Sequence, residues 1–232
     1  MTTLTDARLQ LHWAAQIAAG VGRTLLAPRP DDSQTAFTFV DGALLQEAHA
    51  GLRAGLRLHD LTLVLGSETF PLHGRTLDDG FAFLESRFGH ALNRPNVDLP
   101  DHPVAHGAAF DADLESCETL GGLYAIADPL LREFAVGPVL CWPHHFDIAT
   151  LLTVREGTTI GVGLSPGDAS YPDPYWYVTP WPYPAVASLP PLTRGTWHTT
   201  GWVGAVLPAT GDARAFIEEA IARCRELLRN HT

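Results

Sequence analysis

The segment 142–202 contains the densest group of side chains that could perform chemistry. Its first motif, W-P-H-H-F-D, ends in His145-Phe-Asp147. If this motif is extended, His145 and Asp147 share one face, because side chains alternate along a strand. These two groups could bind Zn²⁺ or Fe²⁺, with Asp168 and His198 as remote partners. A His–Asp hydrogen bond, or a buried Asp that holds a loop, is the alternative, because the spacing specifies no complete metal site.

Aromatic side chains are concentrated in the same segment. On a strand, Tyr175, Tyr177 and Trp181 would line one face. Together with Trp197 and Trp202 they could form a stacking wall beside Asp168, His145 and His198. Such a wall suits a sugar, a nucleobase or a flat metabolite. Core packing is the alternative, since aromatic residues dominate cores as well as pockets. The candidate ligand-binding residues are therefore His145, Asp147, Asp168, Tyr175, Tyr177, Trp181, His198 and Trp202.

A serine motif in this segment, Gly163-Leu-Ser165-Pro-Gly167, matches the G-x-S-x-G pattern of a nucleophile elbow. The residue after the serine must donate its N–H to the oxyanion hole, and Pro166 has no N–H. The following residues, D-A-S-Y-P-D-P, cannot begin the required helix. We therefore expect a strand end that turns through Pro-Gly, with Ser165 or Asp168 holding the turn.

A second pair of polar residues, His12 and Gln16, has the i,i+4 spacing of helix neighbours that can hydrogen-bond. A pair on the helix surface is the usual interpretation, and a contribution to a cleft is the alternative.

Apolar periodicity predicts the elements that would position these groups. A first helix begins at Asp6 and ends near Gly20 and Gly22. Further helices are predicted from Asp78 or Asp79, over Leu114–Phe134 and over Asp212–Arg229. Strands are predicted over Thr35–Val40, Leu56–Leu65, Thr69–His73, Val139–Trp142, Phe146–Val154, Thr159–Leu164, Tyr175–Trp181 and Trp202–Leu207.

This element order predicts an α+β fold, with antiparallel sheet flanked by helices. Short polar turns favour antiparallel pairing, and the missing strand–helix–strand alternation argues against Rossmann and TIM-barrel folds. The order helix, strands, helix occurs twice, and both closing helices carry D-x-x-x-F-[LI]-E, at Asp79 and Asp212. We expect a single compact domain, 1–232, in which 1–105 and 106–232 are either duplicated halves or alike by coincidence.

Composition excludes some partners. The formal charge of −11 disfavours nucleic-acid binding. Three distant cysteines without C-x-x-C, and an N-terminus unlike a signal peptide, predict a reduced, cytoplasmic protein without disulfides. No run approaches the roughly 20 apolar residues that span a bilayer, so no membrane association is expected.

Along most of its length, the chain resembles an uncharacterised bacterial family that is classed as a domain of unknown function. The motifs that carry the resemblance are L-H-x-x-x-Q at Leu11–Gln16, H-F-D-I-A at His145–Ala149, S-P-G-D at Ser165–Asp168 and P-Y-x-Y-V-x-P-W at Pro174–Trp181. The resemblance implies no particular activity or cofactor. Because the broader relatives keep Phe-Asp without the preceding histidine, it favours Asp147 over His145 as a functional or structural position.

Three functions remain open at this point. The leading expectation is a protein that binds a small molecule in an aromatic-walled cleft. The alternatives are a metal-dependent hydrolase that uses His145, Asp147, Asp168 and His198, and a structural protein that forms a homo-oligomer through its aromatic strands.

Overall fold

The computed structural model describes residues 3–229 and confirms the α+β class, with two antiparallel sheets. The chain forms two compact units. The first unit comprises the chain up to Ile126 together with Leu140–Phe146. The second comprises Ala127–Val139 and the chain from Asp147 onward.

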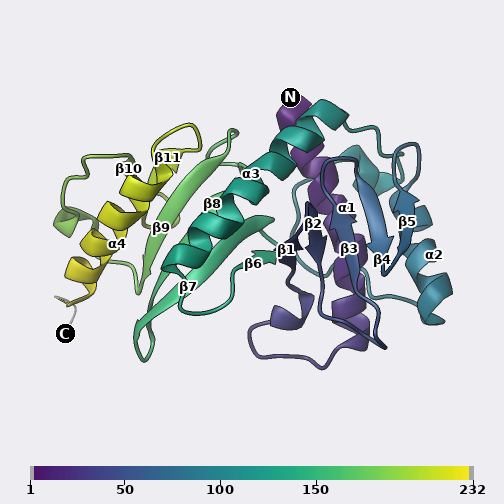
Figure 1. Cartoon of the computed structure of the whole chain (residues 1–232). Coiled ribbons are helices and arrows are strands. Elements are labelled where there is room, and N and C mark those ends of the chain that lie inside the picture. The colour runs from purple at the N-terminus through teal and green to yellow at the C-terminus, as the bar shows by residue number, and fades with distance from the viewer. Residues whose placement is uncertain (1–2, 230–232) are drawn as a thin grey trace. The chain divides into compact units, whose positions relative to one another are not determined.

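The first unit is built around a buried helix and a five-stranded meander (Figure 1). The order β1-β2-β3-β4-β5 follows the chain, every pair is antiparallel, and helix α1 packs against β3 and α2. Its elements are α1 (Thr3–Leu25), η1 (Ser33–Thr35), β1 (Thr38–Val40), β2 (Ala43–Leu45), β3 (Ala54–Arg57), β4 (Thr62–Leu65), β5 (Glu68–Pro71), α2 (Leu77–Phe88), η2 (Pro103–His106), the first part of α3 (Leu114–Phe134) and β6 (Leu140–Trp142).

Two predictions for this unit were wrong. Helix α1 continues past its glycines to Leu25. Gly22 does not end the helix; it lets the backbone at Gln34 lie close to α1. A Cβ atom on Gly22 would lie 2.1 Å from the backbone oxygen of Gln34. The predicted strand Leu56–Leu65 is a hairpin, whose turn is held by an ion pair between Arg57 and Asp60 at 2.6 Å.

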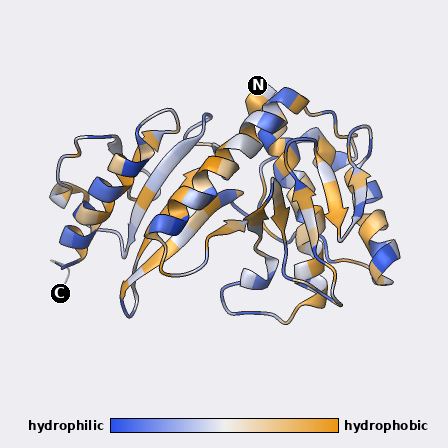
Figure 2. Cartoon of the chain, viewed as in Figure 1, coloured by the Kyte–Doolittle hydropathy of each residue, from blue (hydrophilic) through white to orange (hydrophobic). Residues whose placement is uncertain are grey.

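The second unit contains a twisted antiparallel sheet on which helix α4 packs (Figure 1). Its strands are neighbours in the order β10-β11-β9-β8-β7, and α4 packs on β9, β8 and β11. Figure 2 shows hydrophilic and apolar residues alternating around α4, whose apolar face is buried. Its elements are the end of α3, β7 (Asp147–Arg155), β8 (Thr158–Ser165), β9 (Tyr175–Trp181), η3 (Val186–Ser188), β10 (Thr196–His198), β11 (Gly204–Pro208) and α4 (Ala213–Arg229).

Both units contain the predicted order of helix, strands and helix. They differ in that β11 lies between β9 and β10, whereas β1–β5 pair in chain order. The duplication of 1–105 and 106–232 stays a prediction.

The expected absence of disulfides is confirmed, because all three cysteines are free and buried. Burial raises the pKa of the Cys117 and Cys224 thiols to about 12. Among the residues 3–229, no helix combines the length and the apolar character that crossing a bilayer requires.

Candidate functional site

Asp147 is the acid that the sequence analysis favoured, and it begins β7 in the second unit. Its side chain is buried, as expected, and it accepts a hydrogen bond from the hydroxyl of Tyr177 on β9. Strand β8 lies between these two strands, and Gly163 on β8 is paired with Tyr177. A Cβ atom on Gly163 would lie 2.6 Å from the Tyr177 hydroxyl oxygen. The Tyr177–Asp147 bond therefore depends on a glycine in the strand between them.

Asp168 holds the turn that follows β8. Its Oδ1 accepts from the backbone N–H groups of Ser170 and Tyr171 at 2.7 and 2.9 Å, and its Oδ2 accepts from the Tyr175 hydroxyl at 2.6 Å. Burial, together with this bond to a carboxylate, raises the pKa of Tyr175 above its usual range. Ser165 accepts from the N–H of Gly167, and no helix follows, so the predicted strand end and turn are confirmed.

His198 joins the aromatic residues of the second unit. Its Nε2 lies 2.7 Å from the carbonyl oxygen of Thr200, and its Nδ1 lies 3.0 Å from the Tyr171 hydroxyl. A carbonyl oxygen only accepts, so in the neutral ring Nε2 carries the proton and Nδ1 accepts from Tyr171. Trp202 stacks on His198 with a centroid separation of 4.4 Å and meets the Tyr177 ring edge-on.

Six of the eight predicted residues therefore belong to one set of contacts, which we call the aromatic–acid network. Tyr171 is a further member that the candidate set did not include. The network comprises Asp147, Asp168, Tyr171, Tyr175, Tyr177, His198 and Trp202.

The other two predicted residues lie outside this network. Trp181 ends β9 with its ring against Tyr183, and 55% of it is exposed. His145 belongs to the first unit and lies in a turn, where its N–H bonds to the Trp142 carbonyl. Phe146 then adopts a φ of 57°. The chain is not extended there, so the prediction that His145 and Asp147 share a strand face was wrong. Within the described part of the chain, no group of three or more His, Cys, Asp or Glu side chains could hold a metal.

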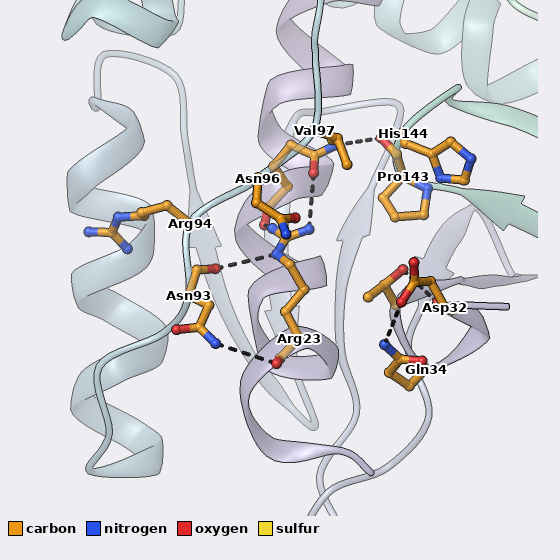
Figure 3. A pocket seen from close by; sticks show the side chains of 11 residues that line it. Arg23, Asp32, Gln34, Asn93, Arg94, Asn96, Val97, Pro143 and His144 are labelled. Atoms are coloured by element: carbon orange, nitrogen blue, oxygen red, sulfur yellow. Dashed lines mark hydrogen bonds between the residues drawn. The ribbon is translucent and has the colours of Figure 1, made fainter. Parts of the chain in front are cut away.

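The first unit contains a polar pocket of about 430 Å³ (Figure 3). It is formed by α1, η1, the segment after α2 and the turn after β6. None of the candidate ligand-binding residues predicted from the sequence lines it.

Gln16 and Arg23 of helix α1 form one wall of this pocket and belong, with His12, to a polar stripe on the helix. His12, Gln16 and Arg23 are separated by four and seven residues, so they fall on one side of a helix. His12 Nε2 and the Gln16 amide both donate to the carbonyl oxygen of Pro143, the former at 2.8 Å. Both side chains are buried, so the expected pair on the helix surface was wrong. The L-H-x-x-x-Q motif instead ties α1 to the turn after β6.

The protonation of His12 follows from this geometry. A carbonyl acceptor requires the proton on Nε2. The ring stacks on Phe146 with centroids 5.2 Å apart and is 4% exposed. Burial lowers the pKa of His12 to about 4, an effect that the nearby charge of Arg8 reinforces.

Arg23 carries the positive charge of the pocket. Its Nη1 donates to Gln16 Oε1 at 3.2 Å, its Nη2 to the Gln16 carbonyl at 2.7 Å, and its Nε to the Asn93 carbonyl at 3.4 Å. These bonds use three of its five N–H groups. Within residues 3–229, no carboxylate lies at ion-pair distance from Arg23. Burial lowers the pKa of Arg23 to about 10, so it is still a cation at neutral pH.

Arg94 also borders the pocket, but its charge is already matched. It pairs with Asp78 at 3.3 Å and Glu85 at 3.1 Å, and its guanidinium lies over the Phe81 ring. Figure 3 shows it pointing away from Arg23.

The opposite wall is formed by η1 and the residue before it. Gly22 lets η1 approach α1, and the buried Gln46 joins them, because it accepts from the Gly22 N–H at 2.8 Å and donates to the Thr35 carbonyl at 2.7 Å. Asp32 precedes η1 in the left-handed region, with a φ of 55°. Its Oδ1 accepts from the Gln34 amide at 3.3 Å.

One sequence signal could have identified this pocket. Helix α1 is buried on nearly all sides, and an amide and an arginine recur on the face of His12. Polar residues at helical spacing within a buried helix indicate dedicated partners, because an unsatisfied buried polar group is costly.

Comparisons with protein-family models, with curated proteins and with solved structures found no match to this chain. The family resemblance given above stays a prediction.

Proposed function

We propose that this protein binds a small organic anion in the polar pocket of the first unit, with Arg23 as the anchor. The observation that carries the proposal is a half-buried guanidinium that lines a pocket and has no carboxylate at ion-pair distance in the described residues. A guanidinium recognises carboxylate and phosphate groups through paired N–H donors, and Arg23 has two N–H groups beyond those in its protein bonds.

The pocket also has the dimensions of a ligand site. A volume of about 430 Å³ lies within the range of about 300–1,000 Å³ that is usual for small-molecule sites. Its wall is preformed, since the Gln16 amide donates to Pro143 and accepts from Arg23, which sets the orientation of both groups. Preorganisation of this kind lowers the entropic cost of binding.

The aromatic–acid network supports a ligand site less well. Asp168 accepts three hydrogen bonds from its own unit, and both ring nitrogens of His198 have protein partners. Polar groups that are satisfied internally favour the packing alternative. A cleft for a sugar or flat metabolite at the network, a metal-dependent hydrolase and a homo-oligomer all stay predictions from the sequence.

The proposal is tested by thermal-shift screening of the whole protein against small mono- and dicarboxylates, hydroxy acids and sugar phosphates, followed by titration calorimetry of the ligands that stabilise it. We expect Arg23→Gln to weaken binding about 10- to 150-fold, which corresponds to the loss of a charge-assisted hydrogen bond. Arg87→Gln is the matched control, because Arg87 is exposed, pairs with Glu68 and does not line the pocket.

Two results would contradict the proposal. One is that no member of the screen stabilises the protein. The other is that Arg23→Gln and Arg87→Gln bind the same anion equally well. Circular dichroism and melting of Arg23→Gln and Arg23→Lys separate lost binding from lost folding, since the lysine variant keeps the charge but not the planar fork of donors.

A further inference from the structure

The pocket carries two opposite charges that do not neutralise each other. Arg23 and Asp32 both line it, yet no nitrogen of Arg23 lies within 4.0 Å of an Asp32 carboxylate oxygen. Neither residue forms an ion pair with any other residue of the described chain. The other cations near these segments are matched, since Arg29 pairs with Glu47 at 2.5 Å and Arg94 pairs with two acids.

Asp32 is held so that its carboxylate faces an open environment. Its N–H donates to the Arg29 carbonyl at 3.0 Å, and its own carbonyl accepts from the N–H and hydroxyl of Thr35, both at 2.9 Å. The backbone position is therefore fixed by the turn. The carboxylate has one protein bond, from the Gln34 amide at 3.3 Å to Oδ1. In the described part of the chain, Oδ2 accepts no hydrogen bond.

We propose that the ligand is a zwitterion of the amino-acid or short-peptide class, whose carboxylate binds Arg23 and whose ammonium group binds Asp32. This inference rests on the proposed function and specifies its ligand. A zwitterion supplies a counter-charge to each unpaired side chain at once. A simple anion would supply a counter-charge to Arg23 and leave the Asp32 carboxylate without one.

The other side chains of the pocket suit the same ligand class. Gln34, Thr35, Asn93 and Asn96 are polar residues of the lining, and Gln34 and Thr35 already hydrogen-bond to Asp32. Such groups donate and accept hydrogen bonds, as a peptide or a polar side chain requires.

The test compares three panels of probes by calorimetry and thermal shift on the whole protein. The first contains the free amino acids and simple dipeptides, the second their N-acetyl derivatives, which are anions, and the third their amides, which are cations. We expect at least one free amino acid or dipeptide to bind tenfold or more tightly than both of its derivatives. Asp32→Asn should remove that preference over the N-acetyl form.

The Asp32→Asn variant has a closely matched control. Asparagine tolerates the left-handed backbone, so Asp32→Asn should keep the turn. Asp41→Asn makes the same change of charge at an exposed residue with a φ of 48° that does not line the pocket, and it should leave the preference unchanged.

The outcomes distinguish this inference from the proposed function. If N-acetyl derivatives or other organic acids bind through Arg23 as tightly as the zwitterions, the inference fails while the anion site stands. If Asp32→Asn and Asp41→Asn behave alike, Asp32 does not read the ammonium group and the inference also fails. If no zwitterion binds, it is refuted, and if no anion of any panel binds either, the proposed function falls with it.

Discussion

The neutral, buried His12 should make the stability of the protein fall when the pH falls below the ordinary histidine range. In the folded protein the pKa of His12 is about 4, whereas the unfolded chain has an ordinary value of 6.5. Between these values the unfolded state binds a proton that the folded state excludes. The contribution of neutral His12 is therefore complete above pH 6.5 and is lost as the pH falls towards 4.

The size of the effect follows from the two pKa values. The full difference is worth about 3 kcal/mol, because each tenfold change in an equilibrium constant is worth about 1.4 kcal/mol. At pH 5 the loss should already be about 2 kcal/mol. For a chain of this size that corresponds to a decrease in melting temperature of about 4–8 °C.

The comparison needs a variant that does not titrate. His12→Gln keeps an N–H donor near the position of Nε2 and can still reach Pro143. Both proteins are unfolded with urea at several pH values from 7.5 to 4.5, and the difference between their free energies of unfolding cancels the titration of all other groups. By pH 5 the wild type should lose about 2 kcal/mol more unfolding free energy than the variant. His90→Gln, at an exposed histidine, is the control. Parallel pH profiles for wild type and His12→Gln would refute the burial argument.

Three further predictions concern packing. In a double-mutant cycle of Tyr177→Phe and Asp147→Asn, the coupling in the free energy of unfolding should be about 1–2 kcal/mol. As a control, Tyr183→Phe, at a side chain that is 41% exposed, should change the free energy of unfolding by less than about 0.5 kcal/mol. Gly163→Ala should lower the free energy of unfolding by about 1–3 kcal/mol, because the added Cβ atom meets the Tyr177 hydroxyl. Gly122→Ala, in open space on α3, should raise it by up to about 1 kcal/mol. If urea unfolding shows changes of the same sign for both variants, this prediction is contradicted. Thiol titration should find all three cysteines in denaturant without reductant and slow reaction in the native protein, and recovery of a single thiol would show a disulfide.

The aromatic–acid network was largely predictable because it depends on strand alternation. Tyr175 and Tyr177 share a face of β9 by spacing alone, and the short connections place β7, β8 and β9 side by side. The partner of Asp147 was not predictable, since Tyr177 reaches it only across Gly163. Which side chain extends over a glycine depends on the register of three strands, and local patterns do not determine that register.

The pocket was not predicted, for a different reason. Its central contacts join α1 to Pro143, more than a hundred residues later in the chain. The sequence predicts a helix end near Gly22 because glycine is a poor helix former. The role of Gly22 in the approach of η1 exists only in the folded unit. The left-handed Phe146, which follows His145 in the turn, likewise has no signal in the residue type.

The two unpaired charges are the strongest reason to assign the pocket a role beyond stability. Gln16 satisfies the Pro143 carbonyl and keeps α1 attached to the turn, and Arg23 orients that amide without bonding to the turn itself. A half-buried guanidinium without a counter-charge loses hydration that its hydrogen bonds to Gln16 and Asn93 only partly replace. An apolar or amide residue would fill the same place at lower cost, and Asp32 could be any residue that tolerates a left-handed turn. Sites that sacrifice stability in this way are typical of function, because their missing partners arrive with the ligand.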